Sequence, residues 1–213
     1  LKNAFKRELQ RSGLDVRVRL TFSGCHGFCE QGPLVIIKPD GILYCKVKEE
    51  DATSIISETV VNGRIIDSLL YENPLTGARI TYEKDIPFYK AQMRVVFGQN
   101  GLIDPTEIKD YIAIGGYKAL CKVITGMRPE EVIGEIKESG LRGRGGGGFP
   151  TWAKWDSCRR ARGDVKYIVC NCDEGDPGAY MDRSLLEGNP HLILEGMLIG
   201  AYAIGAREGY IYV

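Results

Sequence analysis

A dense run of glycines could hold a flat or phosphorylated ligand. Residues 143–148 read GRGGGG and satisfy the pattern G-x-G-x-x-G, but that pattern should leave a strand, whereas this segment follows the helical stretch EEVIGEIKESG. No Lys-Ser or Lys-Thr pair stands at the spacing of a P-loop. What remains is a turn whose bare backbone can approach a ligand and whose N–H groups can bind an anion. A flexible loop is the plainer alternative, although the aromatic residues Phe149, Trp152 and Trp155 favour a planar or apolar ligand.

An acidic segment, CNCDEGDPG at 170–178, follows a predicted strand at 165–169. Ligands of open parallel sheets bind beyond the carboxyl ends of strands, which is where this segment lies. Its clustered carboxylates and amide could hydrogen-bond ribityl or ribose hydroxyls, and a solvated acidic turn is the alternative. The C-x-C spacing of Cys170 and Cys172 is poor for a metal, so thiols in the core are favoured.

Cys25 and Cys29 form a C-x3-C pair in a glycine-rich loop. Thiolates at close spacing, with loop N–H groups near the sulfurs, suit an iron–sulfur cluster. Two ligands are only half of a 2Fe-2S site, and a zinc site or a thiol redox pair also fits this spacing. His26 could bind zinc, but we expect it to fill the loop, and we expect His191 to be structural.

The first part of the chain predicts a small α/β module. Apolar spacing predicts a helix at 1–12, a half-buried strand at 14–22, a hairpin at 34–47 around a Pro-Asp-Gly turn, and a helix at 49–61. Residues 71–104 are rich in turn signals, so we place a domain boundary there. The second part predicts short helices from 105, a helix at 129–140, a helix ending near 161, a helix at 190–206 and a final strand at 210–213. Its strand–helix–strand order favours a parallel sheet.

Composition excludes several classes of protein. The 28 Lys+Arg balance 28 Asp+Glu, so the basic excess of a typical nucleic-acid binder is missing. Seven cysteines without a secretory signal indicate reduced thiols or metal ligands. No apolar run is long enough for a membrane span, and we expect a cytoplasmic protein. The chain starts without Met in a helical pattern and stops within a strand, so we expect a fragment truncated at both ends.

The motifs GLRGRGGGGFPTWAKW, CNCDEGDPGAYMDRSLLEGNPHLILEGMLIGAYAIGA and GYIYV together resemble the flavin-bearing subunit of the complex I (NADH:quinone oxidoreductase) family. They are most similar to the β subunits of NAD(P)-linked iron-only, electron-bifurcating hydrogenases and the diaphorase subunits of NAD-dependent formate dehydrogenases. The segment GCHGFCEQGPLVIIKPDGILYCKV resembles the second half of a thioredoxin-like 2Fe-2S ferredoxin domain. The resemblance implies an α/β fold with a partial thioredoxin-like ferredoxin module at 1–70, a linker at 71–104, and the N-terminal part of a Rossmann-like FMN-binding domain at 105–213.

The same resemblance implies a set of site residues. The FMN would lie on the backbone of Gly143, Arg144, Gly145 and Gly146, with Lys154 beside it. Phe149 would stack on the nicotinamide coenzyme. The flavin and its ribityl chain would contact Asn171, Asp173 and Glu174, and Asp176 takes a position near the coenzyme where the respiratory members have glutamate. Cys25 and Cys29 would be the later two of four 2Fe-2S ligands, and a 4Fe-4S domain would follow Val213.

The implied function is electron input. Hydride from NAD(P)H would pass to FMN, and single electrons would pass to iron–sulfur clusters, or the reverse, in a soluble hydrogenase or dehydrogenase complex. The implied partners are the other subunits of that complex, including an iron–sulfur subunit, and the 213-residue chain alone is expected to be inactive. Two alternatives stay open: a docking scaffold without a cofactor and, less favoured, a thiol redox module built on Cys25 and Cys29.

Overall fold

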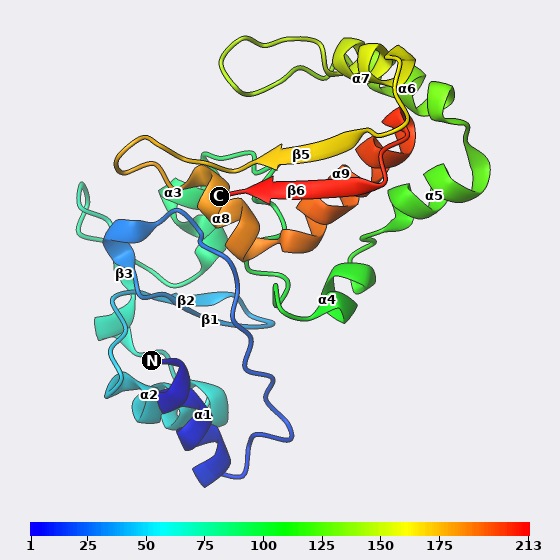
Figure 1. The fold of residues 1–213 in the computed structure, drawn as a ribbon. Coiled ribbons are helices and arrows are strands. Elements are labelled where there is room, and N and C mark those ends of the chain that lie inside the picture. The colour runs from blue at the N-terminus through cyan, green and yellow to red at the C-terminus, as the bar shows by residue number, and fades with distance from the viewer. The chain divides into compact units, whose positions relative to one another are not determined.

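The computed structural model describes residues 1–213 and divides into two compact units, Leu1–Gly98 and Gln99–Val213. Both units mix helices with small two-stranded sheets (Figure 1). The boundary between them falls inside the segment 71–104, where turn signals predict a linker. The finer descriptions of these units as a partial thioredoxin-like module and a Rossmann-like domain stay predictions, because two strands per sheet do not define either fold.

The first unit begins with α1 (Lys2–Arg11), followed after a long loop by the hairpin of β1 (Val35–Ile37) and β2 (Ile42–Tyr44). The strands pair antiparallel, with Ile37 opposite Ile42, as the Pro-Asp-Gly turn predicts. The helix α2 (Asp51–Ser54) continues as a π-helix over Ile55–Val61 and ends before Gly63, which has a φ of +67°. The predicted hairpin and both predicted helices of this unit are therefore confirmed.

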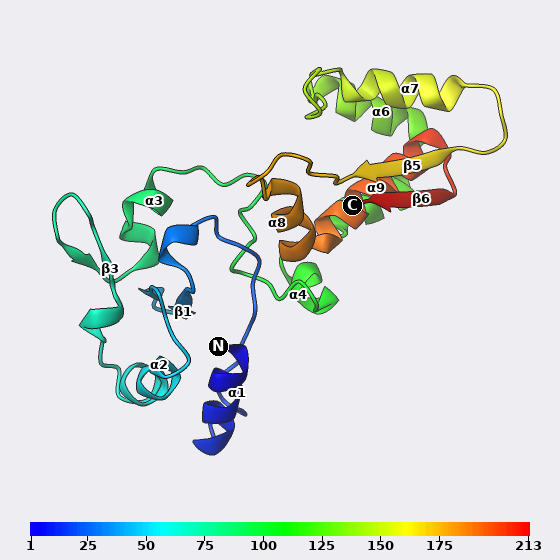
Figure 2. The same cartoon turned by 60° about the vertical axis from the view of Figure 1, so that its left-hand side comes forward.

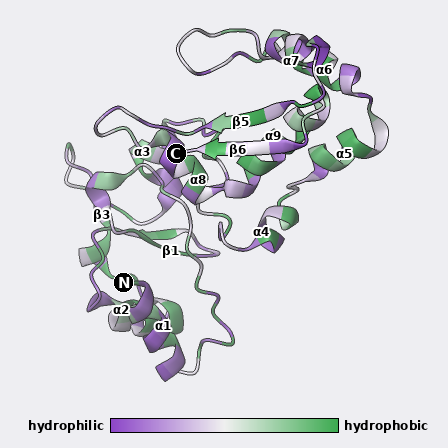
Figure 3. Cartoon of the chain, in the orientation of Figure 1, coloured by the Kyte–Doolittle hydropathy of each residue, from purple (hydrophilic) through white to green (hydrophobic).

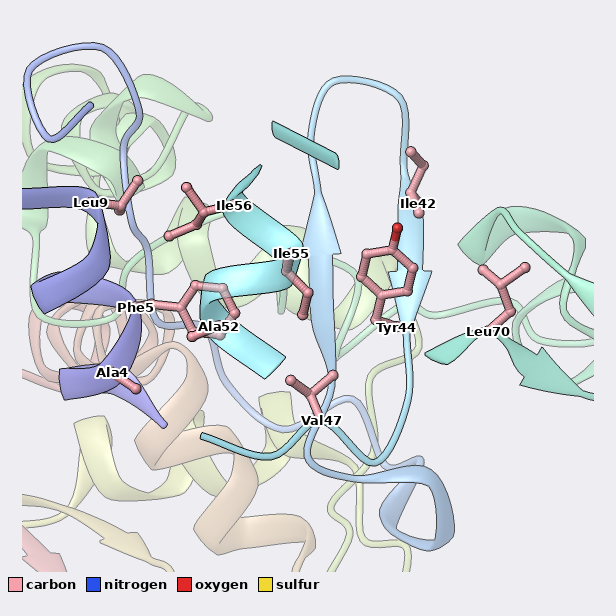
Figure 4. Close-up of a cluster of buried hydrophobic side chains, with 10 residues drawn as sticks. All are labelled: Ala4, Phe5, Leu9, Ile42, Tyr44, Val47, Ala52, Ile55, Ile56 and Leu70. Atoms are coloured by element: carbon pink, nitrogen blue, oxygen red, sulfur yellow. The ribbon is translucent and has the colours of Figure 1, made fainter. Parts of the chain in front are cut away.

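Buried side chains from these elements form one core, which Figure 4 shows converging from α1, α2 with its π-helical extension, and β2. Tyr44 is fully buried in it, and its hydroxyl lies 2.6 Å from the Thr59 hydroxyl and accepts the N–H of Ile66 at 3.1 Å. The core keeps the hairpin fixed against the helices, and the hairpin in turn follows the cysteine-bearing loop in the chain. Its buried members are Ala4, Phe5, Leu9, Ile42, Tyr44, Val47, Ala52, Ile55, Ile56 and Leu70.

The predicted strand at 14–22 is wrong. Arg17 and Val18 donate backbone N–H bonds to the Leu14 carbonyl, so this segment begins as a turn and then runs without a partner strand. Val18 and Leu20 pack against the core, but Val16 is 85% exposed. Alternation of residue types does not make a strand where no neighbouring strand accepts its hydrogen bonds.

The remainder of the first unit is made of short elements. The strands β3 (Tyr71–Glu72) and β4 (Arg79–Ile80) pair antiparallel, and single 3-10 turns occupy Cys29–Gln31, Asp67–Leu69 and Glu83–Asp85 before α3 (Pro87–Lys90). A second cluster buries Leu43, Cys45, Tyr71 and Ile86.

The second unit is organised around α9 (Pro190–Ile204), which contacts helices α5 to α8 and both strands. The strands β5 (Tyr167–Asn171) and β6 (Glu208–Tyr212) lie parallel, which confirms the sheet predicted from the strand–helix–strand order (Figure 2). Figure 3 shows hydrophobic residues along β5 and at the carboxyl end of β6. The other helices are α4 (Ile108–Ala113), α5 (Lys118–Gly126), α6 (Pro129–Glu138), α7 (Thr151–Arg160) and α8 (Met181–Gly188).

Two features of this unit decide where the candidate site lies. The strand β5 begins and ends two residues later than the predicted 165–169, so it includes Cys170 and Asn171. The helices α6 and α7 pack on each other and on α9, burying Val132 and Ile133 with partly buried Trp152 and Trp155, so the glycine segment joins two fixed helices. None of the helices is both long and apolar enough to cross a membrane.

Candidate functional site

The glycine loop is closed at its base by backbone hydrogen bonds. Gly143 N–H donates to the Phe149 carbonyl at 2.8 Å, and Thr151 N–H donates to the Leu141 carbonyl at 3.0 Å. The Arg142 guanidinium also donates to the Gly148 carbonyl at 3.2 Å. The segment is therefore held at both ends although it has no regular secondary structure.

The apex of this loop is bare backbone. A Cβ atom placed on any of the glycines at 145–148 would have no other atom within 4 Å. Gly146 and Gly148 have φ values of +95° and +56°, which a side chain would make costly. Arg144 folds back and donates to the Arg142 carbonyl at 2.6 Å. An added Cβ atom would therefore meet little at the apex, which leaves its backbone open to a ligand.

The start of α7 provides one exposed aromatic ring and one cation. The Phe149 side chain is 51% exposed, and Lys154 Nζ lies 5.6 Å from the centre of its ring. Trp152 and Trp155 instead pack into the hydrophobic cluster, where Lys137 Nζ lies 4.7 Å from the Trp152 ring. Of the three aromatic residues near the glycines, only Phe149 is therefore placed to meet a ligand.

The acidic turn begins at the carboxyl end of β5, as predicted. Cys172 N–H extends the sheet by donating to the Tyr212 carbonyl at 2.8 Å. The Asn171 side chain then accepts the Asp173 N–H at 3.0 Å, which turns the chain away from the strand. The side chains of Asp173 and Asp176 are exposed, so both can reach a ligand.

Glu174 has a structural role in the turn. Its carboxylate accepts the backbone N–H groups of Met181, Asp182 and Arg183 at 2.6, 3.1 and 3.3 Å, at the N-terminus of α8. Desolvation acts to raise the pKa of Glu174, but these three donors outweigh it and lower the pKa below its ordinary value. The charged carboxylate thus fixes the turn to α8, a contact that the residue pattern does not predict.

The glycine loop and the acidic turn project from the same end of the second unit in both Figure 1 and Figure 2. No hydrogen bond or ion pair joins them. The structure thus gathers ten of the predicted residues in two neighbouring segments: Gly143, Arg144, Gly145, Gly146, Phe149, Lys154, Asn171, Asp173, Glu174 and Asp176. Their roles toward a ligand stay predictions.

A separate apolar groove of about 380 Å³ lies between α9 and β6. Its walls include Tyr117, Met197 and Ile211, with Arg207 and Glu208 at its polar side. It shares no residue with the predicted flavin site.

The cysteine loop of the first unit offers two sulfur ligands. Cys25 and Cys29 are both exposed, and Gly27 N–H donates to the Cys25 sulfur at 3.3 Å. His26 Nδ1 is directed elsewhere, 3.2 Å from the Tyr89 hydroxyl and 3.4 Å from a Glu83 oxygen. No group of three potential metal ligands comes together, so this loop offers two sulfur ligands and no more.

A buried polar network in the second unit was missed by sequence reasoning. Glu195 on α9 accepts the Tyr111 hydroxyl at 2.5 Å and the N–H groups of Tyr117 and Leu120 at 2.9 and 3.1 Å. The Tyr117 hydroxyl lies 2.9 Å from Nδ1 of His191, which confirms a structural environment for this histidine. A single glutamate in an otherwise apolar helix was the available signal, because a buried carboxylate needs donors.

Comparison with known proteins places the second unit in context. Residues 136–213 match the family model described as Nuo51 FMN-binding domain. The chain is 54% identical over 124 residues to the NADP-reducing hydrogenase subunit HndC of Solidesulfovibrio fructosivorans, covering 58% of this chain and 25% of that protein. It is 48% identical over 106 residues to an NADH-quinone oxidoreductase subunit of Rhizobium meliloti, covering 50% of this chain and 25% of the relative.

A longer alignment also includes most of the first unit. The NAD-reducing hydrogenase HoxS subunit alpha of Cupriavidus necator is 33% identical over 189 residues, covering 89% of this chain and 29% of that subunit. The crystal structure of an NAD+-reducing [NiFe]-hydrogenase in the air-oxidized state aligns with a TM-score of 0.46 and 22% identity, over 99% of this chain and 34% of that one, which is too low to show a shared fold. The sequence matches confirm the resemblance drawn from the motifs, and the chain spans about a quarter of the length of these relatives.

Proposed function

We propose that this chain, whose residues 136–213 match the Nuo51 FMN-binding domain, is part of an electron-input module that exchanges hydride between NAD(P)H and FMN and single electrons with iron–sulfur clusters. The observation that carries the proposal is the glycine apex at 145–148, where an added Cβ atom would meet nothing within 4 Å and whose base is held by hydrogen bonds. The proposed partners are the other subunits of a multisubunit hydrogenase or dehydrogenase, including an iron–sulfur subunit.

The glycine loop and the start of α7 would hold the flat part of the ligand. Bound FMN would supply the chemistry that joins two-electron hydride transfer to single-electron transfer. The backbone of residues 143–146, including that of Arg144, lets a planar ring approach, and Lys154 places positive charge beside it. Such a cation stabilises negative charge on a reduced ring or on a phosphate. Exposed Phe149 offers its face to the nicotinamide.

The acidic turn would hold the polyhydroxyl part. Asn171 and Asp173 present oxygen acceptors for ribityl hydroxyls at the carboxyl end of β5. Glu174 already uses three acceptor positions on α8, and a carboxylate has about four, so one stays for a hydroxyl. Exposed Asp176 would contribute near the coenzyme. Cys25 and Cys29 would supply two of the four cysteines of a 2Fe-2S cluster.

A substitution at the loop apex tests the proposal. Gly145 tolerates a Cβ atom within the protein, since nothing lies within 4 Å and its φ is outside the left-handed region. We expect Gly145→Ala to keep the thermal midpoint but to weaken FMN binding at least about tenfold, because the methyl group stands where the ring would lie. FMN fluorescence during titration with protein measures this change.

The matched control is Gly134→Ala on α6, where a Cβ atom also meets nothing within 4 Å. It should leave FMN affinity unchanged and stabilise the helix by about 0.5–1 kcal/mol. Equal FMN affinity in wild type and Gly145→Ala would refute the proposed placement of the ring.

A further inference from the structure

Two thiols meet at the carboxyl end of β5. Cys170 and Cys172 flank Asn171, and because side chains alternate along a strand, both point to the same face. Their sulfur atoms lie 3.2 Å apart. Cys170 is partly exposed, whereas Cys172 is buried. A small reagent can therefore reach the first sulfur while the second lies in contact behind it.

This pair does not suit a metal ion. Two thiolates on a tetrahedral zinc would be about 3.8 Å apart, given a Zn–S bond of about 2.3 Å. No third His, Cys, Asp or Glu completes a ligand group with them. The short contact between two sulfurs, one of them accessible, instead suits a reaction between the two.

We propose that Cys170 and Cys172 are a reversible thiol–disulfide pair that is oxidised by a low-molecular-weight disulfide such as oxidised glutathione. The Cys170 thiolate attacks the external disulfide, forms a mixed disulfide and releases one thiol. Cys172 then loses its proton, attacks the Cys170 sulfur and releases the second thiol. Two protein thiols and one external disulfide thus give one protein disulfide and two small thiols.

The environment of the two sulfurs sets the order of these steps. Burial, followed by the contact with Cys170, raises the pKa of Cys172 to about 12. Because the thiolate is the nucleophile, the buried thiol reacts last and only with a sulfur already beside it. The mixed disulfide therefore forms first on Cys170, and attack by Cys172 then resolves it.

Closure would change the start of the acidic turn. At about 3.3 Å per residue, an extended strand holds these two Cα atoms about 6.6 Å apart, longer than the ~5.5–6 Å that is most common for a disulfide. Bridging them pulls Asn171 out of the extended conformation and strains two bonds, from Cys172 N–H to Tyr212 and from Asp173 N–H to Asn171. Oxidation should then weaken FMN binding, a consequence that rests on the proposed function.

Peptide mapping of the 213-residue chain tests the pair. Trypsin should release residues 167–183 as one peptide, because it follows Lys166 and ends at Arg183 without another Lys or Arg, and its only cysteines are Cys170 and Cys172. After exposure to oxidised glutathione, alkylation and digestion, we expect this peptide two hydrogens lighter and unalkylated. Dithiothreitol should restore two alkylated cysteines.

Single substitutions identify each sulfur. Cys172→Ser should trap the glutathione adduct on Cys170, and Cys170→Ser should leave Cys172 alkylated and without an adduct. Cys121, exposed and distant in sequence, reports that the reagent is active. Two wild-type results would overturn the proposal. In the first, the peptide keeps both cysteines alkylated under conditions in which Cys121 forms a glutathione adduct. In the second, the peptide carries the glutathione adduct and forms no internal disulfide, as the Cys172→Ser variant does. These wild-type results decide the question even if a variant fails to fold.

Titration of FMN into reduced and oxidised protein separates the two proposals. Weaker binding after disulfide formation supports the coupling to Asn171, and equal binding overturns that coupling. Absence of binding by the reduced protein counts against the proposed function and leaves the disulfide result standing.

Discussion

Individual side chains in the second unit take part in more than the predicted binding contacts. Glu195 is only 7% exposed, and its carboxylate lies between the start of α5 and the Tyr111 hydroxyl. Desolvation acts to raise its pKa, but the Tyr111 hydroxyl and the backbone donors at the start of α5 together lower it. This carboxylate thus joins α9 to α5 through its charge.

Glu195 gives a pH-dependent prediction. A pKa lowered by folding means that the stabilisation is fully present above the unfolded value of about 4.3 and is lost as the pH falls through the native value. We expect Glu195→Gln to lower the free energy of unfolding at pH 7 by about 1–3 kcal/mol, because bonds to a charged acceptor are lost. Between about pH 5 and pH 3 the wild type should lose stability more steeply than the variant.

Tryptophan fluorescence during urea unfolding measures this effect, since both tryptophans belong to the second unit. The control is Glu187→Gln, whose exposed carboxylate pairs with Arg183 at 2.9 Å and should change stability by less than about 0.5 kcal/mol. Parallel pH profiles for wild type and Glu195→Gln would show that the buried carboxylate does not stabilise the fold through its charge.

At the scale of elements, α9 holds the strands and helices that carry the site. Gly200 lies where this helix meets its neighbours: a Cβ atom there would be 3.2 Å from both the Ile168 and Trp155 side chains. Gly200 must therefore stay small, because side chains from both β5 and α7 pack against α9 at this position.

We predict that Gly200→Val lowers the free energy of unfolding of the second unit by about 1–3 kcal/mol through overpacking. The matched control is Gly196→Val, one turn earlier on the same helix, where a Cβ atom meets nothing within 4 Å. The control should change stability little, since valine is no worse than glycine in a helix. Urea midpoints compare the two, and equal midpoints would mean that α9 does not pack closely at Gly200.

Elements that depend on local sequence signals were predicted correctly. Features that depend on contacts between distant residues were not. The hairpin followed from two apolar runs around a Pro-Asp-Gly turn, and the order of helices and strands in the second unit followed from periodicity. The strand at 14–22 was wrong because pairing depends on a distant neighbour that alternation does not reveal. The capping of α8 by Glu174 and the contact between Cys170 and Cys172 were missed for the same reason, since both depend on where the turn after β5 folds.

At the scale of the whole molecule, the two units have separate cores. Leu43 is completely buried in the first unit, in a cluster with Cys45, Tyr71 and Ile86. No buried cluster contains residues from both units. Local unfolding of one unit should therefore leave the other protected.

We predict that Leu43→Ala destabilises the first unit by about 2–5 kcal/mol and speeds amide hydrogen exchange only within residues 1–98. Leu75→Ala, at a position 93% exposed in the same unit, should leave exchange unchanged. Hydrogen exchange followed by mass spectrometry measures the amide exchange rates of both units in one experiment. Faster exchange throughout 99–213 in Leu43→Ala would show a single cooperative unit and would contradict the proposed division into domains.

A docking scaffold would use a different surface of the molecule from a flavin-binding site. The β5–β6 sheet exposes Tyr167, Val169, Tyr210 and Tyr212, which is unusual for parallel strands. A scaffold would use such surfaces and would leave the glycine loop and the acidic turn without a ligand. The two functions are therefore separated by asking which backbone amides respond to FMN.

Amide chemical shifts of the 15N-labelled chain during titration with FMN show whether the flavin binds at the glycine loop and the acidic turn. We predict that the amides of the glycines at 145–148 and of residues 171–176 shift together and saturate at the same FMN concentration. Shifts confined to the apolar groove beside Tyr117 and Ile211, or no response at the glycine amides, would contradict it.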